Sequence, residues 1–354
     1  MKKFSIILPD LRAGGAQRVA LNIASEIDSN INVELILLDK IGEYLDIIPK
    51  HISIHNLSKK RILKSIIPLI KLLNKLNPDI IFSTLGHINI ILLMIKPFIN
   101  NKSQIWIREA NMPSLSIPNW DKSFIIKNLY KLLYPFADKL ICSSNQMKKE
   151  FVNNYNISSD KVYVLYNPVK VNEIRLKAKN IIKKDIIGQH FVTVGSLDYQ
   201  KGIDRLITYM NKIKNKSSHL TIIGTGHLKN ELQKMVDNYN LNDNVSLIGY
   251  CSNPYKWIAG ADAFLLSSRW EGMPNVVLES LACSTDVIAT TECGAVSEII
   301  DNNHVIIVNA GEEYLGAMNN VSIKNKTVIG ENLLNSNFNI SNVMPTVENW
   351  INEL

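Results

Sequence analysis

Two glutamates placed eight residues apart are the strongest chemical signal in the sequence. Glu271 and Glu279 belong to the segment SSRWEGMPNVVLE (267–279), which follows the apolar run AFLLSS (263–268). The run predicts a strand, and Asn275 is suited to cap a following helix, so Glu279 would lie about one turn into that helix. The two carboxylates can then bind separate hydroxyl groups of one extended ligand, while the helix N-terminus receives its phosphates. A dipole-stabilised glutamate beside a solvated one explains the same pattern in isolation.

A loop with residues suited to phosphate binding follows the first predicted strand of each half of the chain. The loop LRAGGAQR (11–18) places Gly14 and Gly15 before a helix, where the backbone can approach a ligand closely. The loop VGSLDYQKG (194–202) places Lys201 before another helix, where its ammonium can meet a phosphate. Both features also occur as plain tight turns and solvated lysines. The P-loop and dinucleotide-binding patterns are absent, so standard NAD binding is poorly supported.

Short apolar runs that alternate with helical patterns predict the elements that must position these residues. Helices are expected at 15–27, 60–76 and 121–134. The predicted strands of the first half are FSIILP (4–9), VELILL (33–38), ISIHNL (52–57), DIIFST (79–84), QIWIRE (104–109), KLICSS (139–144) and KVYVLY (161–166). Those of the second half are FVTVGS (191–196), LTIIGTG (220–226), VSLIGY (245–250), AFLLSS (263–268), DVIATT (286–291) and HVIIVN (304–309). Continuous apolar strands joined by helices are typical of doubly wound parallel sheets.

The pattern stops near Pro168, which predicts a boundary between two Rossmann-like domains, 1–168 and 169–339. Residues 170–186 are charged and show no strong periodicity. We expect the final amphipathic helix, 340–354, to cross the junction and pack back on the first domain, because Trp350 needs an apolar surface to cover. Two tandem Rossmann-like sheets predict a ligand cleft between their carboxyl ends.

The composition supports a folded, non-secreted chain. Of 354 residues, 46% are hydrophobic and 20% are charged, and the length predicts about two domains. The apolar run near the N-terminus is too short for a signal peptide. The longest apolar block, 88–99, is too short to cross a bilayer. The four cysteines form no CxxC pair, which favours reduced thiols over disulfides or a zinc site. We therefore expect a cytoplasmic protein.

All the excess positive charge lies in the first half. Residues 1–168 contain 22 Lys and Arg against 13 Asp and Glu, whereas residues 169–354 contain 17 against 19. Such a basic half favours a polyanionic partner: nucleic acid, an anionic lipid surface or a phosphate-bearing substrate. Common surface lysines are the plain alternative.

Two helical segments mix basic with apolar residues and therefore predict an interfacial docking surface, although a helix that faces the core needs the same apolar content. The basic residues that carry this prediction in the first segment are Lys59, Lys60, Arg61, Lys64, Lys71 and Lys75. In the second, Trp120, Asp121 and Lys122 lead into a helix with Phe124, Lys127, Tyr130 and Lys131.

Together these segments resemble the retaining glycosyltransferases of family 4, which have the GT-B fold of two Rossmann-like domains facing a central cleft. The resemblance runs through GGAQR (14–18), VGSLDYQKGIDRLI (194–207), LIGY (247–250), EGMPNVVLE (271–279), as the family's E-x7-E motif, and TECGAVSEII (291–300). It implies that Lys201 contacts the nucleotide diphosphate, Glu279 the ribose and Glu271 the transferred sugar, with Lys201 and Glu271 as the catalytic residues. The other donor-binding residues it implies are Gly15, Ser196, Gly249, Tyr250, Arg269, Gly272, Met273, Pro274, Asn275 and Val276. It implies acceptor-binding residues at Gly14, Gly15, Arg18, His87, Arg108 and Glu109.

The sequence departs from the family pattern at a position expected to bind the diphosphate. The family often has Arg where this chain has Ser196, so one counter-charge is missing, and Arg12, Arg18 or Arg269 is expected to compensate. The family's histidine after a first-domain strand is also not evident at Arg108-Glu109. His87 is the other candidate there, and a structural role fits it equally well.

The resemblance implies transfer of a hexose or N-acetylhexosamine from a nucleotide diphosphate sugar, with UDP as the expected nucleotide, to a polyprenyl-diphosphate-linked glycan. Cell-surface polysaccharides such as lipopolysaccharide or capsule are the expected products, made on the inner face of the plasma membrane. Front-face attack, in which the leaving phosphate helps to deprotonate the acceptor, usually explains retention in this family. With no DxD motif, neither a metal nor another cofactor is implied, and nucleic acid is not an expected partner. A nucleotide-sugar 2-epimerase and a non-catalytic glycan- or lipid-binding subunit remain the alternatives.

Overall fold

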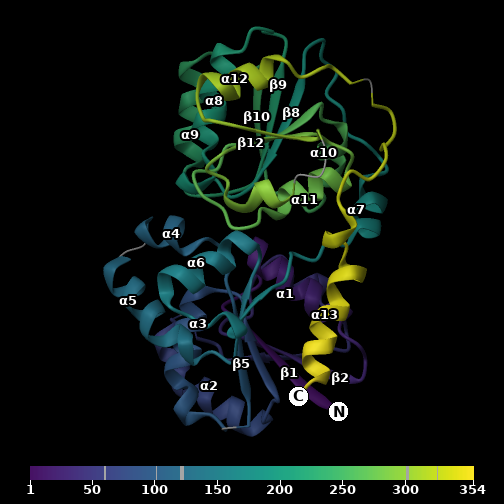
Figure 1. Ribbon diagram of the computed structural model, residues 1–354. Helices are drawn as coiled ribbons and strands as arrows, with labels where there is room; N and C mark the ends of the chain where they lie inside the picture. Colours follow the sequence, from purple (N-terminus) through teal and green to yellow (C-terminus); the bar gives the residue numbers. More distant parts are fainter. Residues whose placement is uncertain (60, 101, 120–122, 300–302, 325) are drawn as a thin grey trace. The chain divides into compact units, whose positions relative to one another are not determined.

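The computed structural model describes residues 1–59, 61–100, 102–119, 123–299, 303–324 and 326–354 (Figure 1). The chain forms two compact units, each with its own sheet. The first contains Met1–Pro168 and Asn337–Leu354, and the second contains Val169–Ser336. Both units are α/β with parallel sheets, which confirms the predicted fold class.

Among the described residues, the first unit contains a sheet of seven parallel strands in the order β3-β2-β1-β4-β5-β6-β7. Its strands are β1 (Lys2–Leu8), β2 (Ile31–Leu37), β3 (Ser53–Asn56), β4 (Ile80–Ser83), β5 (Gln104–Arg108), β6 (Lys139–Cys142) and β7 (Val162–Val164). Phe4 of β1 pairs with Val33 on one side and with Ile80 on the other. Helices cover both faces of the sheet, which explains why its inner strands are mainly apolar.

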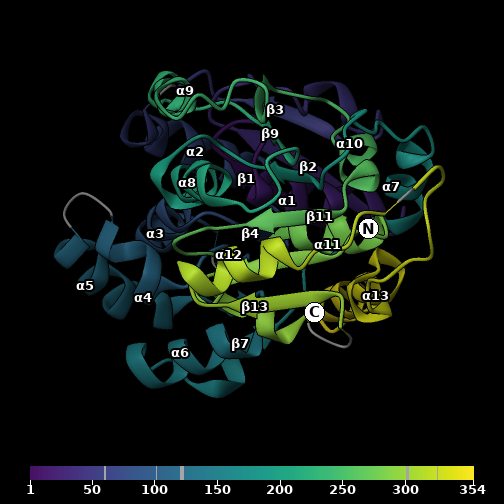
Figure 2. The ribbon, with the colours of Figure 1, turned by 90° about the horizontal axis from the view of Figure 1, so that it is seen from above.

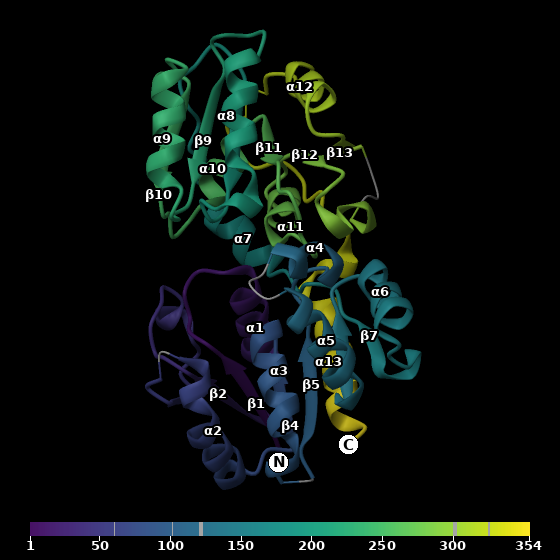
Figure 3. The ribbon, with the colours of Figure 1, turned by 90° about the vertical axis from the view of Figure 1, so that its left-hand side faces the viewer.

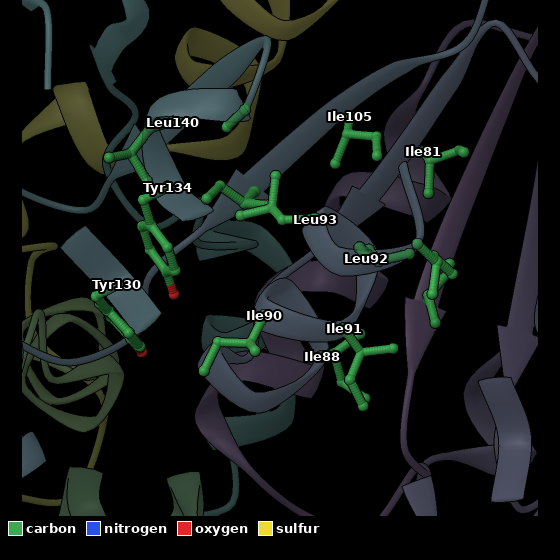
Figure 4. Packing of buried hydrophobic residues seen from close by; sticks show 14 of the residues in the cluster. Ile81, Ile88, Ile90, Ile91, Leu92, Leu93, Ile105, Tyr130, Tyr134 and Leu140 are labelled. Carbon is green, nitrogen blue, oxygen red and sulfur yellow. The ribbon is translucent and has the colours of Figure 1, made fainter. Parts of the chain in front are cut away.

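Two separate apolar cores lie on the two faces of this sheet. The helices are α1 (Gly15–Glu26), α2 (Ile62–Leu76), α3 (Gly86–Ile95), α4 (Pro113–Ser116), α5 (Ser123–Leu133), α6 (Asn145–Tyr155) and α13 (Ile340–Asn352). Short 3-10 turns are η1 (Leu45–Ile47), η2 (Lys96–Phe98), η3 (Ile117–Asn119), η4 (Tyr134–Phe136) and η5 (Ser159–Lys161). Helices α1 and α13 share one core with Phe4 and Ile6, while α2, α3, α5 and α6 share the other with Ile7. Successive β1 side chains therefore point to opposite faces. Figure 4 shows part of the second core, with Ile88 and Tyr134 among its members.

The C-terminal helix α13 packs on the sheet of the first unit beside α1 (Figure 1). The Trp350 ring lies edge-on to those of Trp106 and Tyr163, at centroid distances of 6.2 and 5.2 Å. The Lys139 ammonium lies over all three rings, 3.7 Å from the centroid of Tyr163. Cation–π and edge-to-face contacts thus help to hold the end of the chain on the sheet.

In the described part of the second unit, six parallel strands run in the order β10-β9-β8-β11-β12-β13. They are β8 (His190–Val194), β9 (His219–Ile223), β10 (Val245–Gly249), β11 (Ala263–Leu266), β12 (Val287–Thr290) and β13 (Val305–Val308). The helices are α7 (Val171–Ala178), α8 (Ile203–Lys212), α9 (Lys229–Asn238), α10 (Tyr255–Gly260), α11 (Asn275–Ala282) and α12 (Glu312–Asn319). The 3-10 turns are η6 (Tyr199–Lys201), η7 (Gly294–Glu298) and η8 (Ser336–Phe338), whose last two residues belong to the first unit.

The helices of the second unit form two groups. Helices α8, α9 and α12 share one apolar core with the sheet, and α8 packs directly on α9 (Figure 3). Helix α10 packs on α7 and α11 (Figure 2). Two local predictions were wrong. A helix occupies Val171–Ala178, where no strong periodicity is visible, and α11 already begins at Asn275, so Pro274 rather than Asn275 is its N-cap. Every helix in the described ranges is too short or too polar to span a bilayer.

Candidate active site

The catalytic candidates follow two neighbouring strands of the second unit. Strands β8 and β11 pair at the point where the strand order reverses direction, and ligands bind outside the carboxyl ends of strands at such a point. Lys201 follows β8, and Glu271 follows β11. Their side chains meet, with Lys201 Nζ 2.5 Å from Glu271 Oε1. The fold therefore brings together two residues 70 positions apart.

The Lys201–Glu271 pair is largely enclosed, with side chains 22% and 7% exposed. Burial by itself lowers the pKa of Lys201, but the charge and hydrogen bond of Glu271 outweigh it, and the net shift of the pKa is upward. Lys201 is therefore a stable cation at neutral pH. Such a fixed positive charge can stabilise an anion without being reorganised first.

The backbone around Lys201 is held by its own turn. The Asp198 carboxylate caps η6 by accepting a hydrogen bond from the Lys201 backbone N–H, at 3.2 Å. Gly202 follows with a φ of +63°, and a Cβ there would lie 2.2 Å from the carbonyl oxygen of Ser267. Only glycine fits this position, because both the left-handed backbone and the close approach exclude a side chain. The contact fixes the Lys201 turn against the end of β11.

Glu271 is oriented by residues on three segments. The Ser268 hydroxyl donates to Glu271 Oε1 at 2.8 Å, on the same oxygen that pairs with Lys201. Gly294, with a φ of +62°, lies so close to the Glu271 carbonyl that a Cβ would approach it to 2.3 Å. Among the described residues, no hydrogen bond reaches Glu271 Oε2, and this atom is not one of the fully enclosed polar atoms that lack a partner. One oxygen is thus held by the protein and the other is open to a ligand.

Glu279 lies on α11, one turn after Asn275 at the start of the helix. The side chain is partly exposed, and the Tyr255 hydroxyl of α10 lies 3.5 Å from its Oε1. Gly272, Met273 and Pro274, which lead into the helix, are buried. The segment from Glu271 to Glu279 therefore runs as one connected loop and helix start at the carboxyl end of β11.

The arginines expected to replace the missing counter-charge have other partners. The Arg269 guanidinium pairs with both carboxylate oxygens of Asp204, at 2.9 and 2.6 Å, and stacks on the Tyr199 ring. Hydrogen bonding to Asp204 raises the pKa of Arg269. In the first unit, Arg12 pairs with Asp10, and Arg18 lies 4.5 Å from the Tyr44 ring centroid.

Three more predicted donor-binding residues occupy loops after β8 and β10. Ser196 is exposed, and its hydroxyl donates to Asp198. Gly249 ends β10 with a φ of +79°, in open space, and Tyr250 beside it is exposed. Val276 is partly exposed in the first turn of α11. Ser196 and Tyr250, like Lys201 and Glu271, follow the carboxyl ends of their strands, and Gly249 is the last residue of β10.

The predicted acceptor residues lie at the carboxyl ends of three adjacent strands of the first unit. Gly14, Gly15 and Arg18 follow β1, His87 follows β4, and Glu109 follows β5, with β1, β4 and β5 side by side. Gly15 and His87 are exposed. The sheet thus brings together residues from three loops.

Arg108 and Glu109 are buried, with 1% and 5% of their surfaces exposed. Arg108 donates a hydrogen bond to the Asn167 side chain. Burial lowers the pKa of Arg108 to about 10 and raises that of Glu109 to about 7. Arg108 is therefore still charged at neutral pH, whereas Glu109 titrates there.

Known proteins match both units. Residues 13–173 match the family described as Glycosyltransferase Family 4, and residues 175–326 match Glycosyl transferases group 1. A Campylobacter jejuni N-acetylgalactosamine-N,N'-diacetylbacillosaminyl-diphospho-undecaprenol 4-alpha-N-acetylgalactosaminyltransferase is 33% identical over 324 residues, covering 88% of this chain and 87% of the relative. The chain belongs to the family-4 glycosyltransferases. A second relative of this glycosyltransferase, the Escherichia coli UDP-Gal:alpha-D-GlcNAc-diphosphoundecaprenol alpha-1,3-galactosyltransferase, is 26% identical and covers 87% of this chain and 82% of its own length.

Solved structures agree on the fold of this glycosyltransferase. Anabaena Alr3699/HepE in complex with UDP and glucose superposes with a TM-score of 0.79 at 16% identity, and each chain is covered completely. The lipopolysaccharide outer core galactosyltransferase WaaB, in its apo form, gives a TM-score of 0.68 at 18% identity, over 99% of both chains. Both units therefore belong to the GT-B fold.

The structure also identifies residues around the Lys201–Glu271 pair that sequence reasoning missed. Ser268 orients Glu271, Asp204 holds Arg269, and Gly294 supports the Glu271 backbone. The first and last lie directly after strands, in SS (267–268) and TECG (291–294), where polar and glycine residues follow an apolar run. Their position after a strand could have marked Ser268 and Gly294 as candidates. The contacts of Asp204 and Gly294 could not be predicted in this way, because they join segments far apart in the chain.

Proposed function

We propose that this glycosyltransferase moves a hexose or N-acetylhexosamine, with retention of configuration, from a UDP-sugar to a lipid-linked glycan. The proposal is carried by the Lys201–Glu271 pair at the carboxyl ends of β8 and β11. A fixed cation suits the diphosphate, and an oriented carboxylate with one open oxygen suits a sugar hydroxyl.

In this proposal, Lys201 and the N-terminus of α11 stabilise the negative charge that grows on the leaving diphosphate. Glu271 Oε2 accepts a hydrogen bond from the transferred sugar, while Oε1 stays with Ser268 and Lys201. The leaving phosphate takes the acceptor proton from the front face. Lys201 is the side-chain counter-charge of the diphosphate in this proposal, because Arg269, the expected replacement in the same unit, is paired with Asp204.

The names of the relatives support the acceptor class. The Campylobacter jejuni relative is named for transfer to a diphospho-undecaprenol glycan, and the Escherichia coli relative for transfer to a diphosphoundecaprenol sugar. The UDP complex of HepE supports a uridine nucleotide. We infer the same two classes for this chain, with cell-surface polysaccharide as the product.

A panel of nucleotide sugars tests the proposal. Purified protein is incubated with each donor, and free nucleotide is measured with and without a polyprenyl-diphosphate-linked glycan. The proposal requires nucleotide release from one donor that depends on the acceptor. Conversion of the donor without an acceptor would indicate an epimerase, and glycan binding without nucleotide release from any donor would indicate a binding subunit.

Glu279→Gln is expected to weaken binding of free UDP by about tenfold to a hundredfold, because a hydrogen bond to a charged group contributes about 1.5–3 kcal/mol. Calorimetry with UDP measures the change. The matched control is Glu231→Gln on α9, an exposed glutamate in the first turn of its helix. Equal UDP affinity in Glu279→Gln and the wild type would exclude a ribose contact.

We also propose that the first unit docks on an anionic membrane, which places the enzyme on the inner face of the plasma membrane. Leu63 and Ile67 of α2 are 74% and 66% exposed, and Lys64 and Lys71 lie on the same helical face. Exposure at this level shows that these apolar side chains do not serve the core. An apolar stripe among lysines suits the membrane interface.

Helix α5 repeats this pattern. Phe124 and Leu132 are 77% and 65% exposed, and Lys127 and Lys131 are exposed beside them. Both α2 and α5 pack against α3, so the three helices lie side by side on one face of the sheet (Figure 3). Tyr130, in contrast, is buried. Four residues of the predicted docking surface, Lys60, Trp120, Asp121 and Lys122, lie outside the described residues.

Vesicle sedimentation tests the docking. Each basic residue near an anionic leaflet contributes about 1 kcal/mol, and the Debye length falls from about 10 Å at 0.1 M salt to about 3 Å at 1 M. We expect binding to anionic vesicles that falls steeply with salt and drops in Lys64→Ser/Lys71→Ser. The control pair, Lys229→Ser/Lys234→Ser, removes two exposed lysines from α9. Equal binding to neutral vesicles, or binding to neither kind, would contradict docking.

A further inference from the structure

A buried carboxylate with one oxygen held by the protein occurs a second time, in the first unit. Glu109 follows β5, and its Oε1 accepts hydrogen bonds from Asn89 Nδ2 at 2.8 Å, from the Tyr130 hydroxyl at 3.3 Å and from the Tyr134 hydroxyl. The two tyrosine rings stack 4.1 Å apart, with both hydroxyls at the same end (Figure 4). Helix α3, helix α5 and η4 thus converge on one carboxylate oxygen.

The other oxygen of Glu109 differs from the first. Among the described residues, no hydrogen bond reaches Glu109 Oε2, and this atom is not one of the enclosed polar atoms that lack a partner. Glu150, another buried glutamate of the same unit, provides the contrast. Its Oε1 accepts from the Ser114 N–H at 2.6 Å and its Oε2 from the Ser114 hydroxyl at 3.0 Å, so both oxygens are used within the fold.

Three donors on one oxygen fix the plane of the carboxylate, which lies at the carboxyl end of the strand beside β4. Oε2 is left to accept a hydrogen bond from a ligand. Gly15 and His87 follow the two strands next to β5 on that side, β1 and β4, at the same edge of the sheet. An oriented oxygen at this edge suits a ligand that donates a hydrogen bond.

We infer that Glu109 is the residue that recognises the acceptor, its Oε2 accepting a hydrogen bond from a hydroxyl of the terminal acceptor sugar. The inference rests on the proposed function and deepens it. Arg108, whose guanidinium is buried and hydrogen-bonded to Asn167, does not contact the acceptor in this scheme.

The ionisation of Glu109 makes this contact dependent on pH. Burial raises the pKa of Glu109 to about 7, against the opposing effect of its three hydrogen-bond donors and of Arg108. The titratable and charged groups around it are Arg108 on β5, Tyr130 on α5, Tyr134 in η4, Cys142 on β6, and Glu150 and Tyr155 on α6. A carboxylate accepts a hydroxyl hydrogen bond more strongly than a neutral acid does, so acceptor affinity should rise with pH through about 7.

Acceptor analogues that each lack one hydroxyl test the inference. For the wild type, we expect kcat/KM to be about tenfold to a hundredfold lower with one of the analogues than with the full acceptor. For Glu109→Gln, kcat/KM should be nearly the same with that analogue and with the full acceptor, because the variant has already lost the contact. The variant should also lose the rise near pH 7 in kcat/KM for the acceptor, with UDP affinity unchanged. Glu150→Gln, the control, should keep the rise.

Folding and function are kept separate in this test. Glutamine preserves an acceptor for Asn89 and the tyrosines, and the thermal midpoint of Glu109→Gln should equal or exceed that of the wild type at pH 8, where the native carboxylate is ionised against its burial. Wild-type acceptor kinetics and an unchanged pH profile in Glu109→Gln would overturn the inference. Acceptor binding measured by calorimetry does not require transfer, so binding through Glu109 without transfer would contradict the proposed function alone.

Discussion

Lys201→Ala is expected to lower kcat by about 10²–10³-fold, because removing one preorganised group that stabilises transition-state charge has an effect of this size. Lys201 is the cation at the carboxyl end of β8, and Arg269, the expected alternative in the same unit, is held by Asp204. The measurement is the steady-state rate of nucleotide release at saturating donor and acceptor.

Lys212→Ala is the matched control for this variant. Lys212 also pairs with a glutamate, Glu312, but at 3.8 Å and with both side chains largely exposed. Thermal unfolding of Lys201→Ala is recorded as well, since the variant leaves the Glu271 carboxylate without its cation. A folded Lys201→Ala enzyme with the wild-type kcat would show that the diphosphate is stabilised elsewhere. If Arg12, Arg18 or Arg269 supplied the second counter-charge, its alanine variant would approach the loss seen for Lys201→Ala.

Glu271→Gln should lower kcat by about a hundredfold while UDP binds with unchanged affinity. The proposed contact of Glu271 is with the transferred sugar, and charge-assisted hydrogen bonds contribute about 1.5–3 kcal/mol. Pre-steady-state transfer assays and UDP calorimetry separate the two effects. The control is Glu292→Gln, because Glu292 also pairs with a basic residue, Arg205, in the same unit. A large loss of UDP affinity in Glu271→Gln would place the contact on the nucleotide instead.

The sheets could be predicted from sequence because most strands are short, mainly apolar runs, and the inner strands are largely buried. All thirteen strands of the described structure coincide with predicted runs, from FSIILP to HVIIVN. Helix α7 could not be predicted in the same way. Its buried residues Val171, Ile174 and Ala178 lie at helical spacing, but charged neighbours mask that spacing over only eight residues.

The site was predictable in its residues but not in its contacts. Position after a strand identified Lys201 and Glu271, but the 2.5 Å ion pair between them depends on which strands are neighbours. Local pattern also could not distinguish Arg108 from Glu109, since the two are neighbours at the end of the same strand. Only the packing of α3, α5 and η4 shows that Glu109 has three donors on Oε1 and none within the described residues on Oε2, while Arg108 is enclosed.

The anomeric configuration of the product tests the central proposal most directly. The wild-type enzyme is given the UDP-sugar selected by the donor panel, ¹³C-labelled at C1 of the sugar, and a polyprenyl-diphosphate-linked glycan, and the new linkage is assigned by NMR. A retaining transfer supported by Lys201 and Glu271 predicts an α-linked product from the α-configured donor, formed only with the acceptor present. A β-linked product, or release of the labelled sugar into water at the same rate without acceptor, would contradict it.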